Sequence, residues 1–162
     1  MSENCVGDLT RRDTERHILA AVDESDNSKR AIMYLADFFC ADKEVFITIL
    51  SIIPEPSEDF FATEAAREQW RFDKETEMNK VLAGYREILL GAGFADGQVA
   101  NRLIIRQCQS IADAILEEQD KLHSCLVVVG RRGISHKEEF IFGSTSSRIL
   151  HHARKCAVLV VE

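Results

Sequence analysis

Glycines and hydroxyl residues near the end of the chain have the types and spacing of a phosphate-binding segment. Gly130, Gly133 and Gly143 follow a valine-rich run, and the hydroxyl residues 144–147 come directly after the last of them. Glycine lets the backbone approach a ligand closely, and a helix that begins after Gly143 leaves its first amide groups without partners inside the helix. Those amides and the helix dipole favour an anion such as phosphate. A plain structural loop remains an open alternative from the residues alone.

The charge of the chain is unevenly distributed. The 162 residues carry a formal net charge of -7, which disfavours nucleic acid or an anionic membrane surface as a partner. The segment 131–155 has six basic and two acidic residues, a net of +4, so the rest carries -11. We therefore expect a positive region around the glycine loop. Arg148, Arg154 and Lys155 would equally suit a solvated helix end.

Other candidate side chains are few. Asp23 follows the first predicted strand, where a carboxylate can contact a ligand or only cap the next helix. His136 lies inside the glycine loop, and His151 and His152 fall in the last turn of a predicted helix, where capping is the simpler role. The sequence contains no Walker-type P-loop and no zinc-ligand spacing. Its five cysteines are widely spaced, so we expect reduced structural thiols.

Alternating apolar patterns predict the elements that position these residues. Short apolar runs predict strands over residues 17–22, 44–53, 98–106, 124–129 and 157–161. Apolar residues at helical spacing predict four helices between them: one after Asp23, a long one that Gly91 and Gly93 terminate, one opened by Ser110, and one over residues 144–152. Strands that alternate with helices predict an α/β fold, an open five-stranded parallel sheet with helices on both faces.

Length and composition favour a single domain. We expect residues 16–162 to form it after a flexible N-terminus of residues 1–15. The hydrophobic fraction of 46% is too high for wholesale disorder. No apolar run reaches the roughly 18–20 residues of a membrane span, and the polar N-terminus lacks a signal-peptide core, so a cytoplasmic protein is expected. Phe60, Phe61 and Trp70 are expected to pack against the core rather than form a lid or partner surface.

From about Arg16 onward, the sequence resembles the universal stress protein family. The resemblance rests on ILAAVDESDNSKRA, ITILSII and GRRGISHKEEFIFGSTSSRIL. The last of these matches the family's nucleotide signature, G-x2-G-x9-G-[ST], at Gly130, Gly133, Gly143 and Ser144. The resemblance implies a Rossmann-like fold of the adenine-nucleotide alpha-hydrolase type. It also implies a stress-response protein that binds ATP or AMP and acts as a regulatory module.

The resemblance implies roles on the adenine and ribose side of the ligand. Asp23 corresponds to the carboxylate that meets the ribose and the adenine side. Ile52 corresponds to the residue of the second strand whose backbone reads adenine. Val129 and Gly130 correspond to the end of the fourth strand, beside the ribose and the phosphates.

On the phosphate side, Gly133 continues the loop, and Gly143, Ser144 and Thr145 correspond to the helix start that cradles the phosphates. Mg²⁺ would be held through the phosphates. The family commonly forms homodimers through its last strand, here Ala157 to Val161, and an exposed apolar edge favours such pairing. Two alternatives to regulatory nucleotide binding stay open: slow Mg²⁺-dependent ATP hydrolysis, and a nucleotide-free protein-interaction domain.

Overall fold

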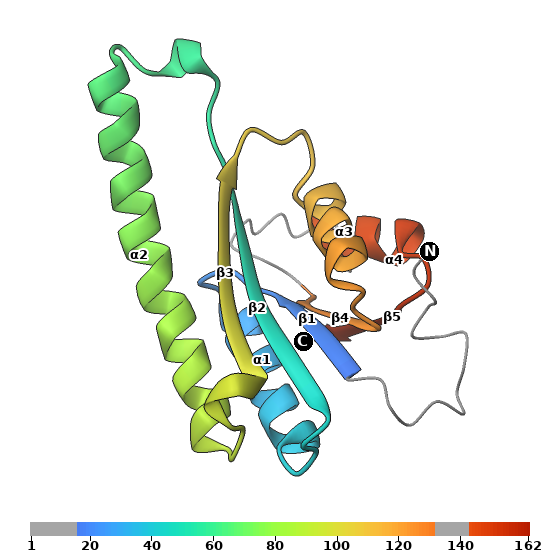
Figure 1. Cartoon of the computed structure of the whole chain (residues 1–162). Helices are drawn as coiled ribbons and strands as arrows, with labels where there is room; N and C mark the ends of the chain where they lie inside the picture. Colours follow the sequence, from blue (N-terminus) through green and yellow to red (C-terminus); the bar gives the residue numbers. More distant parts are fainter. Residues whose placement is uncertain (1–15, 132–142) are drawn as a thin grey trace.

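Five parallel strands form one sheet in the order β3-β2-β1-β4-β5 (Figure 1). The structure, a computed structural model, describes residues 16–131 and 143–162. The strands are β1 (Arg16–Ala21), β2 (Val45–Pro54), β3 (Val99–Arg106), β4 (Leu126–Gly130) and β5 (Ala157–Val161). This confirms the predicted open parallel sheet and places β3 and β5 at its two edges.

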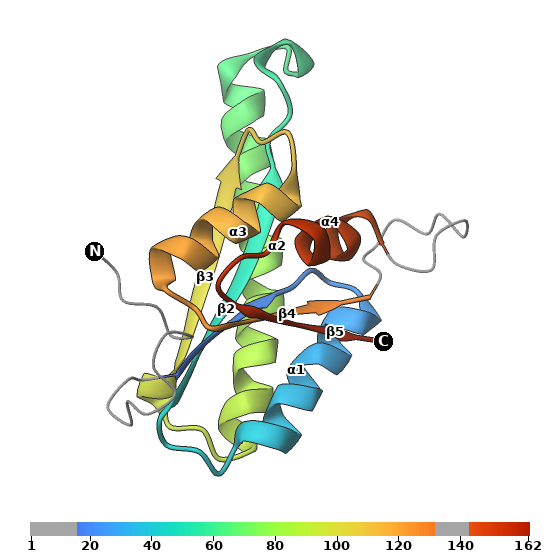
Figure 2. The ribbon, with the colours of Figure 1, turned by 90° about the vertical axis from the view of Figure 1, so that its right-hand side faces the viewer.

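Two pairs of helices cover the two faces of the sheet (Figures 1 and 2). The pair α1 (Asp26–Phe39) and α2 (Glu64–Gly91) packs on one face, and the pair α3 (Ile111–Leu122) and α4 (Ser144–His152) packs on the other. Two short 3-10 turns, η1 (Glu58–Phe60) and η2 (Asp96–Gln98), precede α2 and β3. The chain steps from β1 outward to β3 and then returns to β4, so right-handed connections put the later helices on the opposite face.

Each face of the sheet has its own apolar cluster. Ile18 and Ala20 of β1 face the cluster under α1 and α2, whereas Leu19 and Ala21 face the cluster under α3 and α4. All four are less than a tenth exposed, as expected for a central strand buried on both faces. Among the described residues, no helix combines the length and the apolar character that a membrane crossing needs.

The boundaries of two elements follow from glycine and proline. Gly93 has a φ of 111°, a left-handed conformation that suits glycine, and it comes directly after Ala92, the C-cap of α2. The prediction that Gly91 and Gly93 terminate this helix is confirmed. The strand β2 runs one residue further than predicted, because Pro54 still stands opposite Arg106 of β3 as the last residue of the ladder.

The prediction that Phe60, Phe61 and Trp70 pack against the core is wrong. Phe60 is 69% exposed. The rings instead contact one another, with centroids 5.1 Å apart for Phe60 and Phe61 and 5.7 Å apart for Phe61 and Trp70. Figure 1 shows the reason: η1 and the start of α2 extend beyond the tip of β3, where no sheet is present to cover these rings.

Glu55 ties the projecting end of α2 to the end of β2. Its side chain is 4% exposed, and its oxygens accept hydrogen bonds from Arg67 Nε at 2.9 Å and from Arg71 Nη1 at 2.7 Å. The hydrogen bond from Arg67 is the largest cause of a lowered Glu55 pKa, and Arg71 acts in the same direction against the effect of burial.

We expect Glu55→Gln to lower the free energy of unfolding at neutral pH by about 1–2 kcal/mol, since two charge-assisted hydrogen bonds weaken. The folded-state pKa lies below the unfolded value, so the ionised carboxylate stabilises the fold at neutral pH, and this contribution is lost as the pH falls through the folded-state pKa. Urea unfolding of both proteins at neutral and acidic pH measures the effect.

Glu58→Gln is the matched control for Glu55→Gln. Glu58 is 79% exposed, with an oxygen 3.8 Å from Arg67 Nη1, so its replacement should change the unfolding free energy by less than about 0.5 kcal/mol. Two outcomes would contradict a stabilising role of the Glu55 hydrogen bonds. One is a loss of unfolding free energy in Glu55→Gln that does not become smaller in acid, and the other is an equal loss in Glu58→Gln.

Candidate functional site

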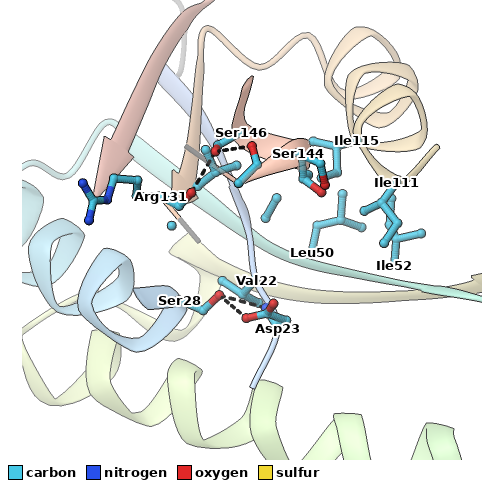
Figure 3. A pocket seen from close by; sticks show the side chains of 15 residues that line it. Val22, Asp23, Ser28, Leu50, Ile52, Ile111, Ile115, Arg131, Ser144 and Ser146 are labelled. Atoms are coloured by element: carbon cyan, nitrogen blue, oxygen red, sulfur yellow. Dashed lines mark hydrogen bonds between the residues drawn. The ribbon is translucent and has the colours of Figure 1, made fainter. Parts of the chain in front are cut away.

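A pocket of about 290 Å³ opens at the carboxyl ends of β1, β2 and β4 (Figure 3). The strand order reverses between β1 and β4, and sheets of this kind bind ligands at such a point. The volume is close to the lower end of the roughly 300–1,000 Å³ of small-molecule sites. The predicted site residues that line it are Asp23, Ile52, Val129, Gly130, Gly143, Ser144 and Thr145. The remaining one, Gly133, lies outside the described residues.

One wall of the pocket is apolar. Leu50 and Ile52 come from β2, and Ile111 and Ile115 come from the first turns of α3 (Figure 3). Neither isoleucine of α3 was among the site residues predicted from the sequence, although their spacing fits an apolar helix face. Periodicity reports that a face is apolar, not whether a cavity or a neighbouring element lies against it. An apolar wall of this kind suits the face of a planar ring.

Asp23 is held at the pocket by the start of α1. Ser25 N and Ser28 Oγ donate hydrogen bonds to Asp23 Oδ1 at 2.9 and 2.8 Å, and Asp23 N donates to Ser28 Oγ at 2.9 Å. The N-cap of α1 is Ser25, so Asp23 is not itself the helix cap. Oδ2 accepts no hydrogen bond within the part of the chain that the structure describes, which leaves it available to a ligand. Ser28 was also missed as a pocket residue.

Tyr85 connects the long helix α2 to this carboxylate. Its hydroxyl donates to the Asp23 carbonyl oxygen at 2.7 Å. Burial, with a smaller contribution from the Asp23 carboxylate, raises the pKa of Tyr85 to about 12, so the phenol remains a donor at neutral pH. Tyr85 therefore fixes the main chain at the residue that presents its side chain to the pocket.

We expect Tyr85→Phe to lower the free energy of unfolding by about 1 kcal/mol, because the half-buried Asp23 carbonyl loses its donor. Chemical denaturation measures this change. Tyr34→Phe is the control: Tyr34 is 38% exposed and stacks on Phe38, so removal of its hydroxyl should cost less than about 0.5 kcal/mol. Equal effects of the two substitutions would show that the Tyr85–Asp23 hydrogen bond adds no stability.

The start of α4 differs from the starts of the other three helices. Side chains of Ser25, Thr63 and Ser110 accept a backbone hydrogen bond at the starts of α1, α2 and α3. The N-cap of α4 is Gly143, and among the described residues no side chain caps this helix. The first amides of α4 and the positive end of its dipole therefore lie at the pocket, open to an anion.

Ser146 fixes the position of this helix start. It is 2% exposed, and its Oγ lies 2.9 Å from the Arg131 carbonyl oxygen and 3.1 Å from the Gly143 carbonyl oxygen (Figure 3). Gly143 N also donates to the Arg131 carbonyl oxygen at 2.8 Å. These bonds join the end of β4 to the start of α4 and hold Ser144 and Thr145 at the pocket.

The expected positive region around the glycine loop is wrong for the basic side chains that the structure describes. Arg148 donates to both carboxylate oxygens of Asp113 on α3, at 2.9 and 2.8 Å, and Arg131 pairs with Glu162. The other two described basic residues of this segment, Arg154 and Lys155, lie between α4 and β5. They are at the amino end of β5, whereas the pocket is at the carboxyl ends of the strands. Arg131 lines the pocket, but its guanidinium pairs with Glu162, so the α4 amides are the described pocket groups that are open to an anion.

The remaining candidate residues are the three histidines near the end of the chain. His151 and His152 lie in the last turn of α4 as predicted, and His151 Nδ1 lies 2.7 Å from the Ser147 carbonyl oxygen. Within residues 16–131 and 143–162, no group of three His, Cys, Asp or Glu side chains could hold a metal ion. His136 lies outside the described residues, as do Arg132 and Lys137.

Gly130 is required by a close approach of β4 to α1. A Cβ at this position would lie 2.9 Å from Asn27 Cβ and 3.0 Å from the Asn27 carbonyl carbon. The close neighbours of Gly130 are atoms of α1, whereas the sequence predicted a close approach to a ligand, which stays a prediction. Gly130 therefore sets the distance between the pocket end of β4 and the first turn of α1, which carries Ser28.

Similarity to known proteins covers nearly the whole chain. The model of the universal stress protein family matches residues 15–162. A Staphylococcus aureus (strain USA300) protein, provisionally named a universal stress protein, is 30% identical over 148 residues, which make up 91% of this chain and 84% of that protein.

Solved structures share the fold at low identity. UspA from Lactobacillus plantarum has a TM-score of 0.72 and 20% identity, over 92% of this chain and 99% of that chain. A universal stress protein from Archaeoglobus fulgidus in complex with dAMP has a TM-score of 0.64 and 17% identity, over 91% and 97% of the two chains. One from Arabidopsis thaliana with AMP bound has a TM-score of 0.60 and 17% identity, over 90% of each chain.

Proposed function

The chain belongs to the universal stress protein family, and from that membership we propose that its pocket binds an adenine nucleotide and that occupancy regulates contacts with partner proteins. One observation carries the proposal. A single pocket at the sheet's reversal point combines an apolar wall, a held carboxylate and an open helix N-terminus. An adenine ring, a ribose and a phosphate group need these three environments in that order.

The pocket residues suggest an orientation for the nucleotide. Adenine lies against the wall of Ile52, Ile111 and Ile115, where its ring faces meet apolar side chains. The ribose hydroxyls donate to Asp23 Oδ2. The phosphates accept hydrogen bonds from the first amides of α4, at Ser144 and Thr145, where the helix dipole stabilises negative charge.

The relatives support an adenylate as the ligand class. Proteins of this fold from Archaeoglobus fulgidus and Arabidopsis thaliana are described in complex with dAMP and with AMP. For this chain we propose ATP or AMP. Since the described residues offer no cluster of metal ligands, Mg²⁺ would be carried by the phosphates of ATP.

Binding is favoured over turnover by the composition of the pocket. Its described lining has one carboxylate, Asp23, and Oδ1 of this group already accepts two hydrogen bonds. A general base also needs a position from which it can reach an attacking water. We therefore propose a regulatory module; a turnover assay with ATP and Mg²⁺ that exceeds the rate in buffer would contradict this.

Two measurements test the proposal. Purified protein is denatured and the released small molecules are identified by mass spectrometry, and nucleotide-free protein is titrated with ATP, AMP and GTP, each with Mg²⁺ and with EDTA. We expect a bound or titrating adenylate and weaker binding of GTP. If no adenylate is released and none binds, the protein is the nucleotide-free interaction domain instead.

We also propose that the chain forms a homodimer through β5. This strand is a sheet edge, and four of its five residues are only half-buried. Ala157 N donates to the Cys125 carbonyl oxygen, and the Val161 carbonyl oxygen accepts from Arg131 N. By alternation, the amides and carbonyls of Val158 and Val160 point away from β4, toward a partner strand.

We expect Val160→Pro to convert the dimer to a monomer. The Val160 N–H points away from β4, so proline removes a hydrogen-bond donor to the partner strand while the hydrogen bonds between β4 and β5 remain. Light scattering after gel filtration should give twice 18.3 kDa for the unaltered chain and 18.3 kDa for the variant, with circular dichroism to verify the fold of both. A monomeric unaltered chain, or a folded variant that stays dimeric, would contradict the β5 interface.

A further inference from the structure

Two cysteines stand opposite each other where β4 and β5 begin. Leu126 of β4 is the register partner of Ala157 of β5, and Ala157 N donates to the Cys125 carbonyl oxygen at 2.8 Å. Extending this register by one residue places Cys125 beside Cys156. Neighbouring strands are about 4.8 Å apart, which falls within the Cα separation of roughly 4.4–6.8 Å seen in disulfides.

Both side chains face the same side of the sheet. Cys156 packs against the apolar cluster under α3 and α4, together with Val158 and Val160 of its strand. Val127 and Val129 of β4 belong to the same cluster, and Cys125 lies two residues before Val127, so strand alternation gives it the same direction. The two Cβ atoms therefore point the same way from adjacent strands.

The immediate surroundings agree with this placement. Burial is the main cause of a raised Cys156 pKa, and Cys125 adds to the rise, as a neighbouring thiol that can become negative does. Both residues are half-buried rather than sealed in the core, so a small oxidant can reach them. Cys125 Sγ also lies 3.4 Å from the His17 carbonyl oxygen, a weak contact that a disulfide would replace.

We propose that Cys125 and Cys156 form a reversible disulfide with a small-molecule disulfide as the oxidant. One cysteine thiolate attacks glutathione disulfide, which forms a mixed disulfide and releases one glutathione thiolate. The second cysteine thiolate attacks the protein sulfur of that mixed disulfide and releases the second glutathione. Two protein thiols are oxidised to one S–S bond, and one glutathione disulfide is reduced to two thiols. This site does not depend on the nucleotide proposal.

The position of the pair predicts what the bond changes. It lies at the amino ends of β4 and β5, whereas the pocket lies at the carboxyl ends. The bond closes a loop that contains β4, the glycine segment and α4. It therefore lowers the conformational entropy of this loop, which includes Ser144, in the unfolded state. For a loop of about 30 residues in a domain of this size, the melting temperature should rise by roughly 10 °C.

Peptide mapping of the full chain tests the proposal. The protein is equilibrated with glutathione and glutathione disulfide for long enough to allow slow exchange at the raised pKa, alkylated, digested and analysed by mass spectrometry. We expect one dominant linked peptide pair that contains Cys125 and Cys156, together with the rise in melting temperature, which dithiothreitol reverses. Cys40→Ser and Cys108→Ser should keep the link, and Cys125→Ser and Cys156→Ser should lose it.

Several outcomes would overturn the site. Glutathione adducts on Cys125 or Cys156 without a link between them would show that the two sulfur atoms cannot reach the geometry of a disulfide. Links shared among all the cysteines, Cys5 included, or links only between two copies of the chain would show no preference for this pair. Because the peptide map is read on the unaltered protein, the test stands even if one of the serine variants folds poorly.

Discussion

Ser144→Glu is expected to lower the affinity for ATP about tenfold or more while the protein stays folded. Ser144 is the exposed first residue of α4, and an acidic side chain there interacts favourably with the helix dipole. The same carboxylate would stand beside the ATP phosphates, where two negative charges about 4 Å apart repel with about 4 kcal/mol in a partly shielded site. Calorimetric titration with ATP measures the loss.

Ser147→Glu is the matched control. Ser147 lies in the same first turn of α4 but does not line the described pocket. The same added charge on the same helix should therefore change ATP affinity by only about twofold, through long-range repulsion that salt screens. Adenosine, which has no phosphate, should bind the unaltered protein and Ser144→Glu equally. Equal losses in the two variants, or no loss in either, would place the phosphates elsewhere.

Gly130→Ala is expected to lower the free energy of unfolding by about 2 kcal/mol, within the range for overpacked sites. The new Cβ would lie 2.9 Å from Asn27 Cβ and 3.0 Å from the Asn27 carbonyl carbon, so β4 and the start of α1 must separate. Urea denaturation with a two-state fit measures the change. A Gly130→Ala protein as stable as the unaltered chain would mean that the two elements can move apart without cost.

Gly84→Ala is the control for that substitution, with the opposite sign. Gly84 lies inside α2, and a Cβ there would meet no atom within 4 Å. Alanine should raise the unfolding free energy by about 0.5–1 kcal/mol, because it favours the helix more than glycine does. Gly130 variants also weaken the scaffold of the pocket. A loss of nucleotide affinity in such a variant therefore does not by itself show where the phosphates bind.

Local sequence patterns predicted the elements well where one strong signal decided each boundary. The helix over residues 144–152 and the strand over 157–161 match the structure residue for residue, since Gly143 starts the first and a valine-rich run marks the second. Eight site residues were predicted, with roles that the family resemblance implies; seven of them line one pocket, and the eighth, Gly133, lies outside the described residues. Parallel strands bring their carboxyl ends to one edge, which is why residues so far apart in the sequence meet there.

What the sequence did not predict depends on contacts between distant elements. The Arg148 charge appeared to belong to the glycine loop, yet it pairs with Asp113, 35 residues away on another helix. Phe60 was expected in the core, but α2 extends past the sheet and leaves it exposed. Ile111 and Ile115 read as ordinary helix packing because nothing in the pattern indicates that a cavity faces them.

The most direct test of the nucleotide site is an NMR titration of the backbone amides with ATP and, separately, with adenosine. We predict that ATP shifts the amides of Ser144 and Thr145 together with those of Ile52 and Val129. Adenosine should shift Ile52 and Val129 but leave the α4 amides nearly unchanged, since it carries no phosphate. Shifts confined to residues outside this pocket, or α4 amides that do not respond to ATP, would contradict the proposed site.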